Sequence, residues 1–150
     1  MTSDFAGALT TVERFTNEAN GRRASDVLSK ARDILAANEL ASSGMSQRRI
    51  SQVLGLSVAT VNRYLNRDER DLTIAKARSI ILGAYLDGTD RGQMVNALAT
   101  MRHTFTETDP DGLDNALSGS WGVVAAAVGA WITEDEWKQI SDRVGRGRFD

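Results

Sequence analysis

The sequence predicts an all-α protein, and three observations carry this prediction. Apolar residues recur every three or four positions in successive segments, as they do along one face of a helix. Ser and Thr residues that can cap helices precede several of these segments, and glycines that can end helices follow them. No segment alternates apolar and polar residues as a half-buried strand does. We therefore expect an N-terminal three-helix module followed by a small helical C-terminal domain.

The expected helices lie at about 3–19, 25–43, 46–53, 58–67, 73–87, 90–103, 113–117, 121–131 and 134–144. In the first of them, an apolar stripe runs from Phe5 to Ala19. Asn20 and Gly21 are expected to end that helix, and a new helix is expected to open at Ser25.

Further signals mark boundaries in the second half of the chain. Thr73 is expected to cap the helix at 73–87. The only proline, Pro110, lies among Asp, Gly and Thr residues at 106–112 and predicts a loop. Thr133 and Glu136 have the spacing of a capping box, which predicts the start of the last helix.

Composition excludes several classes of site. The chain has no cysteine and a single histidine, His103, so disulfides, thiolate metal sites and histidine-rich metal sites are excluded. The start of the chain lacks the pattern of a secretory signal. The longest apolar stretch, Trp121 to Trp131, has 11 residues, whereas a membrane-spanning helix needs about 20. We expect a soluble cytoplasmic protein that makes no membrane contact, binds no metal and needs no cofactor.

Charge is distributed unevenly along the chain, although the net charge is only −2. Residues 14–78 hold 12 Lys/Arg and 7 Asp/Glu, whereas residues 79–150 hold 6 Lys/Arg and 11 Asp/Glu. This asymmetry suits a basic half that binds an anionic polymer beside an acidic half that does not.

Residues 46–65 have the pattern that two helices joined by a tight turn require. Gly55 stands at the turn, where positive φ is needed, and the small Ser51 lies one helical turn before it. Ser57 follows as the N-cap of the second helix. The inside of the angle is expected to be filled by Ile50, Leu54, Leu56, Val61, Tyr64 and Leu65.

The outward face of the second helix can reach base edges in a DNA major groove. The residues expected to contact bases are Val58, Ala59, Asn62, Arg63 and Asn66. Those expected to contact phosphates are Gln47, Arg48, Arg49, Ser57, Thr60 and Arg67. Arg22 and Arg23, which precede the three-helix module, are candidates for an arm in the minor groove.

The segment Gly-Leu-Ser-Val-Ala-Thr-Val-Asn-Arg-Tyr-Leu at 55–65 resembles the recognition half of bacterial helix-turn-helix regulators. It is similar above all to the G-[LV]-S-x-x-T-V-x-R pattern of lactose-repressor-type proteins. Residues 31–65 also resemble the homeodomain-like three-helix module of resolvases, transposases and sigma factors. The resemblance implies that Val58, Ala59 and Arg63 contact bases. Ser51 departs from the usual alanine, and the C-terminal half resembles no family.

These observations predict a sequence-specific regulator of transcription that binds double-stranded DNA, most simply a repressor of bacterial or temperate-phage type. Two other roles fit the same module: an accessory DNA-binding factor in recombination, and an antitoxin or other protein that binds a host regulator. A homodimer through the C-terminal helices is a further expectation. The divisions expected are an amphipathic helix at 1–21, the DNA-binding module at 22–70 and an acidic helical domain at 71–150.

No enzyme motif accompanies the DNA-binding pattern, so we expect no catalytic residues. The chain has no phosphate-binding glycine loop, no His-Glu-x-x-His and no nucleophile beside a histidine. Asp109, Asp111 and Asp114 cluster in the expected loop, which suits solvation better than metal catalysis. The apolar segment between Trp121 and Trp131 must be buried on several sides, in the domain core or in a subunit contact.

Overall fold

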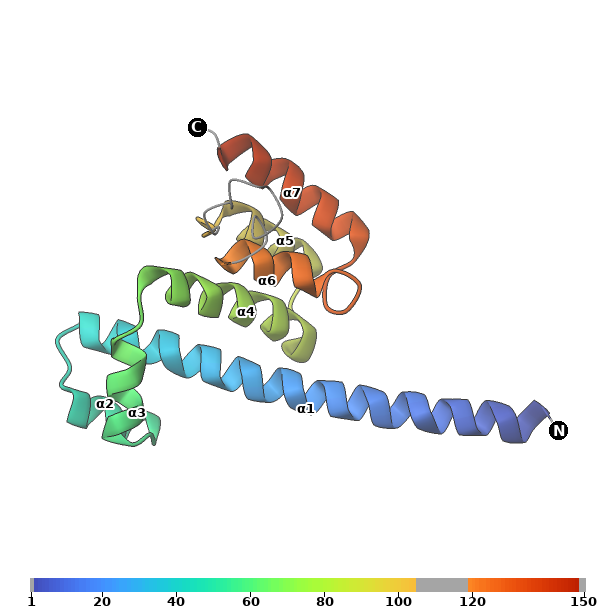
Figure 1. The fold of residues 1–150 in the computed structure, drawn as a ribbon, viewed down its shortest axis with the longest axis horizontal. Coiled ribbons are helices and arrows are strands. Elements are labelled where there is room, and N and C mark those ends of the chain that lie inside the picture. The colour runs from blue at the N-terminus through green and yellow to red at the C-terminus, as the bar shows by residue number, and fades with distance from the viewer. Residues whose placement is uncertain (1, 105–118, 149–150) are drawn as a thin grey trace, which may run out of the picture.

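The computed structural model describes residues 2–104 and 119–148, with side chains described for 11–104 and 119–144. Within these ranges the chain forms helices and no strand, apart from an isolated bridge between Val128 and Ile132, so the predicted all-α class is confirmed (Figure 1). The helices are α1 (Thr2–Ser42), α2 (Gln47–Leu54), α3 (Val58–Leu65), α4 (Glu69–Asp87), α5 (Arg91–Thr100), α6 (Gly119–Ala127) and α7 (Glu134–Arg148).

The long helix α1 is the rod on which the rest of the protein is assembled. It is one helix of 41 residues, so the predicted break at Asn20 and Gly21 and the new start at Ser25 are wrong. Glycine inside a helix costs only about 1 kcal/mol relative to alanine. Just beyond this point Ala24 and Leu28 become buried against Leu82 of α4, and this burial favours continued helix.

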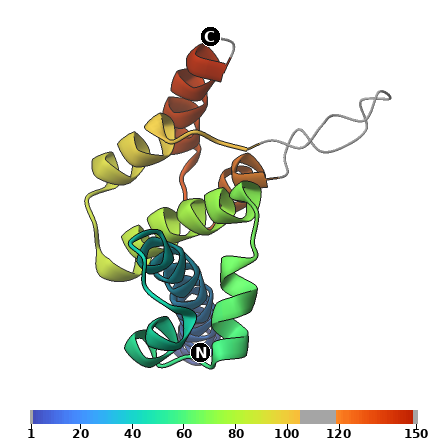
Figure 2. The same ribbon diagram turned by 90° about the vertical axis from the view of Figure 1, so that its left-hand side faces the viewer.

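Helix α4 lies along α1 on one side and carries the C-terminal helices on the other (Figures 1 and 2). Ala31 and Ile34 of α1 pack against Ala75 of α4. The predicted cap at Thr73 is wrong, because α4 begins a turn earlier, where the Asp68 carboxylate accepts a 2.8 Å hydrogen bond from the backbone N–H of residue 71. The predicted end is confirmed, since Gly88 takes positive φ of 68°.

The C-terminal domain surrounds a core shared by α4, α5, α6 and α7. Its fully enclosed side chains include Ile81, Met94, Leu98, Val124 and Ile140. Trp121 is only 8% exposed and stacks on Trp137 with ring centroids 4.8 Å apart. This part of the apolar segment therefore lies in the domain core, one of the two placements that the sequence allowed.

The ends of α5 and α6 fall earlier than the sequence suggested. Helix α5 stops at Thr100 rather than His103, with an extended residue at its C-cap. Helix α6 stops at Ala127, and Gly129 turns the chain with φ of 87°. The half-buried Trp131 then returns against the ring of Tyr85, with centroids 4.5 Å apart.

The capping box of α7 is confirmed and has a second use. Glu136 accepts a 2.9 Å hydrogen bond from the N–H of Thr133, whose hydroxyl accepts one of 3.1 Å from the N–H of Glu136. The same carboxylate receives two hydrogen bonds from Arg91 of α5, at 2.8 and 2.6 Å. These bonds hold the pKa of Glu136 below its usual value, against an opposing effect of burial. The charged pair thus ties α5 to α7.

Some predicted features lie outside the described residues: the loop at 106–112 with Pro110, the helix at 113–117, and the acidic residues Asp109, Asp111 and Asp114. Within the described ranges, no helix combines the length and apolar composition that a membrane span requires.

Exchanging Gly21 for alanine tests the continuity of α1. An added Cβ would meet no atom within 4 Å and the backbone is helical, so Gly21→Ala should stabilise the protein by about 0.5–1 kcal/mol in urea unfolding. The matched variant Gly55→Ala should lose about 1–2 kcal/mol, because Gly55 has φ of 69°. A loss of stability in Gly21→Ala would indicate that the chain breaks there.

The sole histidine should make stability depend on pH. His103 Nε2 donates to the carbonyl of Leu98 at 2.6 Å, and its Nδ1 lies 3.0 Å from the hydroxyl of Ser120. Burial lowers the pKa of His103, partly opposed by the bond to Leu98. Because the folded state holds the proton less tightly than the unfolded state, this contribution to stability is present above about pH 6.5 and is lost as pH falls.

We therefore expect urea midpoints of the wild type to fall between pH 7 and pH 5, and those of His103→Gln to fall distinctly less. Equal slopes for the two proteins in this window would show that His103 does not carry the effect.

Candidate nucleic-acid interface

Gly55 and Ser51, the two residues that the sequence placed at the turn between α2 and α3, form the hydrogen bonds that close it. Gly55 has φ of 69°, and its N–H bonds to the carbonyl of Ser51. The N–H of Leu56 donates to the same carbonyl at 3.1 Å, while the hydroxyl of Ser51 donates to the carbonyl of Leu56. The sequence indicated only that residue 51 must be small; the structure shows that its hydroxyl also fastens the turn.

A serine side chain caps the N-terminus of each of the two short helices, α2 and α3. The hydroxyl of Ser46 accepts a hydrogen bond from the N–H of Arg49 at 3.2 Å. That of Ser57 accepts one from the N–H of Thr60 at 3.1 Å, which confirms the predicted cap of α3. Such caps satisfy backbone donors that a helix start leaves unpaired. The first turn of α3 is therefore set by its own sequence.

A fully buried apolar cluster holds α2 and α3 against α1. Ala37 of α1, Ile50 of α2 and Val61 of α3 have no solvent exposure and touch one another. The partly buried residues around them are Leu40, Ala41, Met45, Leu54, Leu56, Tyr64 and Leu65. All six residues predicted to fill the inside of the angle belong to this cluster.

Asn38 adds a polar anchor that sequence reasoning missed. Its side-chain amide donates to the carbonyl of Ile34 at 2.8 Å and to that of Tyr64 at 3.0 Å. The second bond holds the last turn of α3 against α1. In the sequence, the signal was a single asparagine among apolar helix residues. Its partner could not be foreseen, because Tyr64 is 26 residues away in sequence.

The outer face of α3 carries the side chains predicted to contact bases. Val58, Ala59, Asn62, Arg63 and Asn66 are all exposed. Helix α3 ends at Leu65, so Asn66 is its C-cap rather than part of a helix reaching residue 67.

Polar contacts orient these exposed side chains. Asn66 donates to the Asn62 amide oxygen at 2.8 Å, and Asn62 donates to Gln47 of α2 at 3.3 Å. Arg63 donates to the hydroxyl of Thr60 at 3.0 Å. The structure thus brings two residues predicted to contact phosphate, Gln47 and Thr60, into contact with residues predicted to read bases.

The surface around α3 is basic. Gln47, Arg48 and Arg49 of α2 are exposed. No acidic residue occurs between Glu39 and Asp68. An arginine-bearing surface without nearby carboxylates on its own segment favours binding of a polyanion.

Arg67 lies apart from the other predicted phosphate contacts. Its guanidinium carbon is 5.6 Å from the centre of the Tyr64 ring, and the side chain lines a cleft between α1 and α4 that also contains Asp71 and Arg78. The position of Arg67 therefore gives no support to its predicted role at the phosphates.

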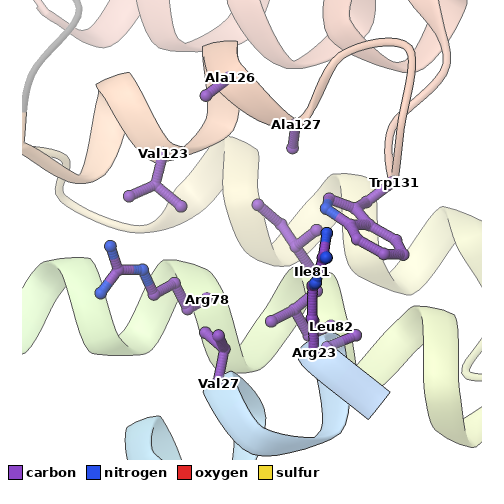
Figure 3. Close-up of a pocket in the computed structure, with 10 residues that line it drawn as sticks. Arg23, Val27, Arg78, Ile81, Leu82, Val123, Ala126, Ala127 and Trp131 are labelled. Atoms are coloured by element: carbon purple, nitrogen blue, oxygen red, sulfur yellow. The ribbon is translucent and has the colours of Figure 1, made fainter. Parts of the chain in front are cut away.

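The expectation of a minor-groove arm at Arg22 and Arg23 is wrong. Both residues lie within α1, well before the part of it that contacts α2 and α3, whereas an arm requires extended backbone. Arg23 instead lines a pocket of about 260 Å³ between α1, α4 and α6, together with Arg78 and Trp131 (Figure 3).

Comparison with known proteins agrees with this geometry. A family model described as a winged helix-turn-helix DNA-binding domain matches residues 32–67, which run from the later part of α1 through α3. The chain therefore carries a helix-turn-helix DNA-binding domain. Residues 66–104 contain no strand, so no β-hairpin wing follows α3. No curated protein and no solved structure matches the chain.

Replacing Asn38 tests the anchor of α3. Asn38→Ala removes the bond to the Tyr64 carbonyl, and we expect a loss of about 1 kcal/mol in the free energy of unfolding. Because α3 would be held less firmly, affinity for DNA should also fall. Glu39→Ala, at the exposed neighbouring position, is the matched control and should keep its stability within about 0.5 kcal/mol. Equal stability of the two variants would contradict the anchoring role.

Proposed function

We propose that the protein is a sequence-specific regulator of transcription that binds double-stranded DNA and acts as a repressor, of the type found in bacteria or temperate phages. The observation that carries the proposal is the exposed outer face of α3, which holds Asn62 and Arg63 in a polar network beside exposed arginines of α2. Polar networks of this kind reduce the ordering cost when a surface meets its ligand.

The size and chemistry of α3 suit a major groove. An α-helix with its side chains is about 10–12 Å across, which fits the groove width of about 12 Å, and the eight residues of α3 run about 12 Å along it. Arg63 has the donor fork that recognises guanine, and Asn62 has the paired donor and acceptor that recognise adenine. Val58 and Ala59 offer apolar contact to a thymine methyl group.

Arg48 and Arg49 would add contacts to the DNA phosphates to these base contacts. Both are exposed at the start of α2, next in sequence to Gln47, whose side chain contacts Asn62 of α3. Exposed arginines there suit phosphate binding, which places the module on DNA without selecting a sequence. Ser57 and Thr60 stand at the N-terminal end of α3, where backbone donors favour an anion.

The protein would repress transcription by binding alone, without catalysing a reaction. Repression then requires only that the bound protein occupies DNA that the transcription machinery needs, and two copies would strengthen that occupancy. A homodimer, which the sequence suggested through the C-terminal helices, stays a prediction.

Duplexes selected from a random pool, followed by affinity titration of variants, test the function. We expect Arg63→Ala to lose about 1–3 kcal/mol of binding to the selected site and to accept more bases at one position. Arg48→Ala should weaken binding to all sequences similarly and reduce the salt slope by about one. Lys138→Ala removes an equal charge from an exposed position on α7 and serves as the control. No enriched sequence, or wild-type behaviour of Arg63→Ala, would contradict the proposal.

A further inference from the structure

Among the described residues, no other helix covers the apolar stripe on the first half of α1, although Arg14 of the same helix lies over the Phe15 ring, 5.0 Å from its centre. Figure 1 shows this part of the helix extending beyond all the others. Val12 is 62% exposed and Phe15 is 56% exposed. The buried clusters that involve α1 begin only at Ala24. Because a helix in water gains most of its stability from packing an apolar face, this segment is expected to pack against another molecule.

The stripe has the spacing of a two-stranded coiled coil. Val12, Phe15 and Ala19 are separated by three and four residues, and in sequence the repeat continues back to Phe5. At about 100° per residue, the three positions lie within roughly 60° of one another around the helix.

This stripe is separate from the face of α1 that packs on α4. Ala24, Leu28 and Ala31, which make that contact, lie roughly 150° around the helix from the stripe. A partner helix seated on the stripe therefore does not meet α4.

The charges beside the stripe are complementary to those of a second copy of this chain. With Val12 and Ala19 at the first heptad position, Glu18 falls at the seventh position and Arg23 at the fifth position of the next heptad. In a parallel coiled coil these positions face each other across the two helices. Glu18 and Arg23 are exposed, and neither has an ion-pair partner among the described residues. The Arg23 side chain, which lines the pocket beside Trp131 in the single chain, would turn out of that pocket to pair. Two symmetric Glu18–Arg23 pairs would therefore form in a parallel homodimer.

The pairing cannot be satisfied within one helix. Residues five apart do not face each other on a helix surface, so Glu18 and Arg23 of the same chain do not meet. An antiparallel arrangement does not bring these two positions together either, because it pairs like heptad positions at the flanks. The observed charges therefore favour the parallel orientation.

We propose that the N-terminal half of α1 forms a parallel homodimer through Val12, Phe15 and Ala19, flanked by the Glu18–Arg23 pairs. Arg22 and Asp26 occupy the next two seam positions, where buried charge is unfavourable, so the seam ends there and the two helices diverge. Ala37, where the helix-turn-helix packs, lies about 27 Å beyond Ala19 along α1. The dimer thus carries two helix-turn-helix modules at the same end.

Single cysteines provide the first test, because the natural chain has none. Ala19→Cys places a thiol in the seam, where first heptad positions of a parallel dimer face each other, and Asn17→Cys places one on the exposed opposite side of α1. On mild oxidation of the full chain without DNA, we expect Ala19→Cys to form an interchain disulfide and Asn17→Cys to form none, so that only the first variant runs as a dimer under denaturing conditions. Equal cross-linking of the two variants, or none in either, would overturn the proposal.

Charge reversal provides the second test, read as the dimer dissociation constant in sedimentation equilibrium. Glu18→Lys and Arg23→Glu each turn two attractions into repulsions and should weaken the dimer on the order of tenfold. The double variant restores opposite charges and should return to within about threefold of the wild type. A double variant as weak as the single variants would refute the pairing. Both tests are independent of DNA, so their failure leaves the proposed function standing.

Discussion

The contact that seals α3 onto α1 is the constraint on which the recognition surface depends. Val61 is fully excluded from solvent between Ala37 and Ile50, and full burial of each large aliphatic side chain contributes about 1.5–3 kcal/mol. Gly55 sets the angle of approach, and Asn38 holds the last turn of α3. With one side of α3 fixed in this way, the opposite side, with Asn62 and Arg63, must face solvent.

Helix α1 joins this surface to the rest of the protein. The helix-turn-helix packs on its C-terminal part, while α4 and the C-terminal helices lie on its other side (Figures 1 and 2). In the described residues α3 packs on α1 and α2, and it lies away from α5, α6 and α7 (Figure 1). Helix α1 thus lies between the helix-turn-helix and the C-terminal helices.

Features that depend on short stretches of sequence could be predicted. The positive φ of Gly55, the cap at Ser57 and the capping box of Thr133 and Glu136 each arise from residues a few positions apart. Features that depend on distant partners could not be predicted. Gly21 stays helical because α4 stabilises the turns that follow it, Arg67 packs on Tyr64 rather than joining the arginines of α2, and Arg91 finds Glu136 across 45 positions. Of the candidate site, the outward face of α3 followed from its sequence, whereas the anchor at Asn38 required the fold.

The central claim is that α3 reads base edges in the major groove. Methylation interference on a duplex selected by the protein tests it most directly, because methyl groups at guanine N7 lie in the major groove and those at adenine N3 lie in the minor groove. The account predicts that methylation of one or more guanines at N7 within the selected site blocks binding. Interference confined to adenine N3, or binding that no methyl group affects, would contradict it.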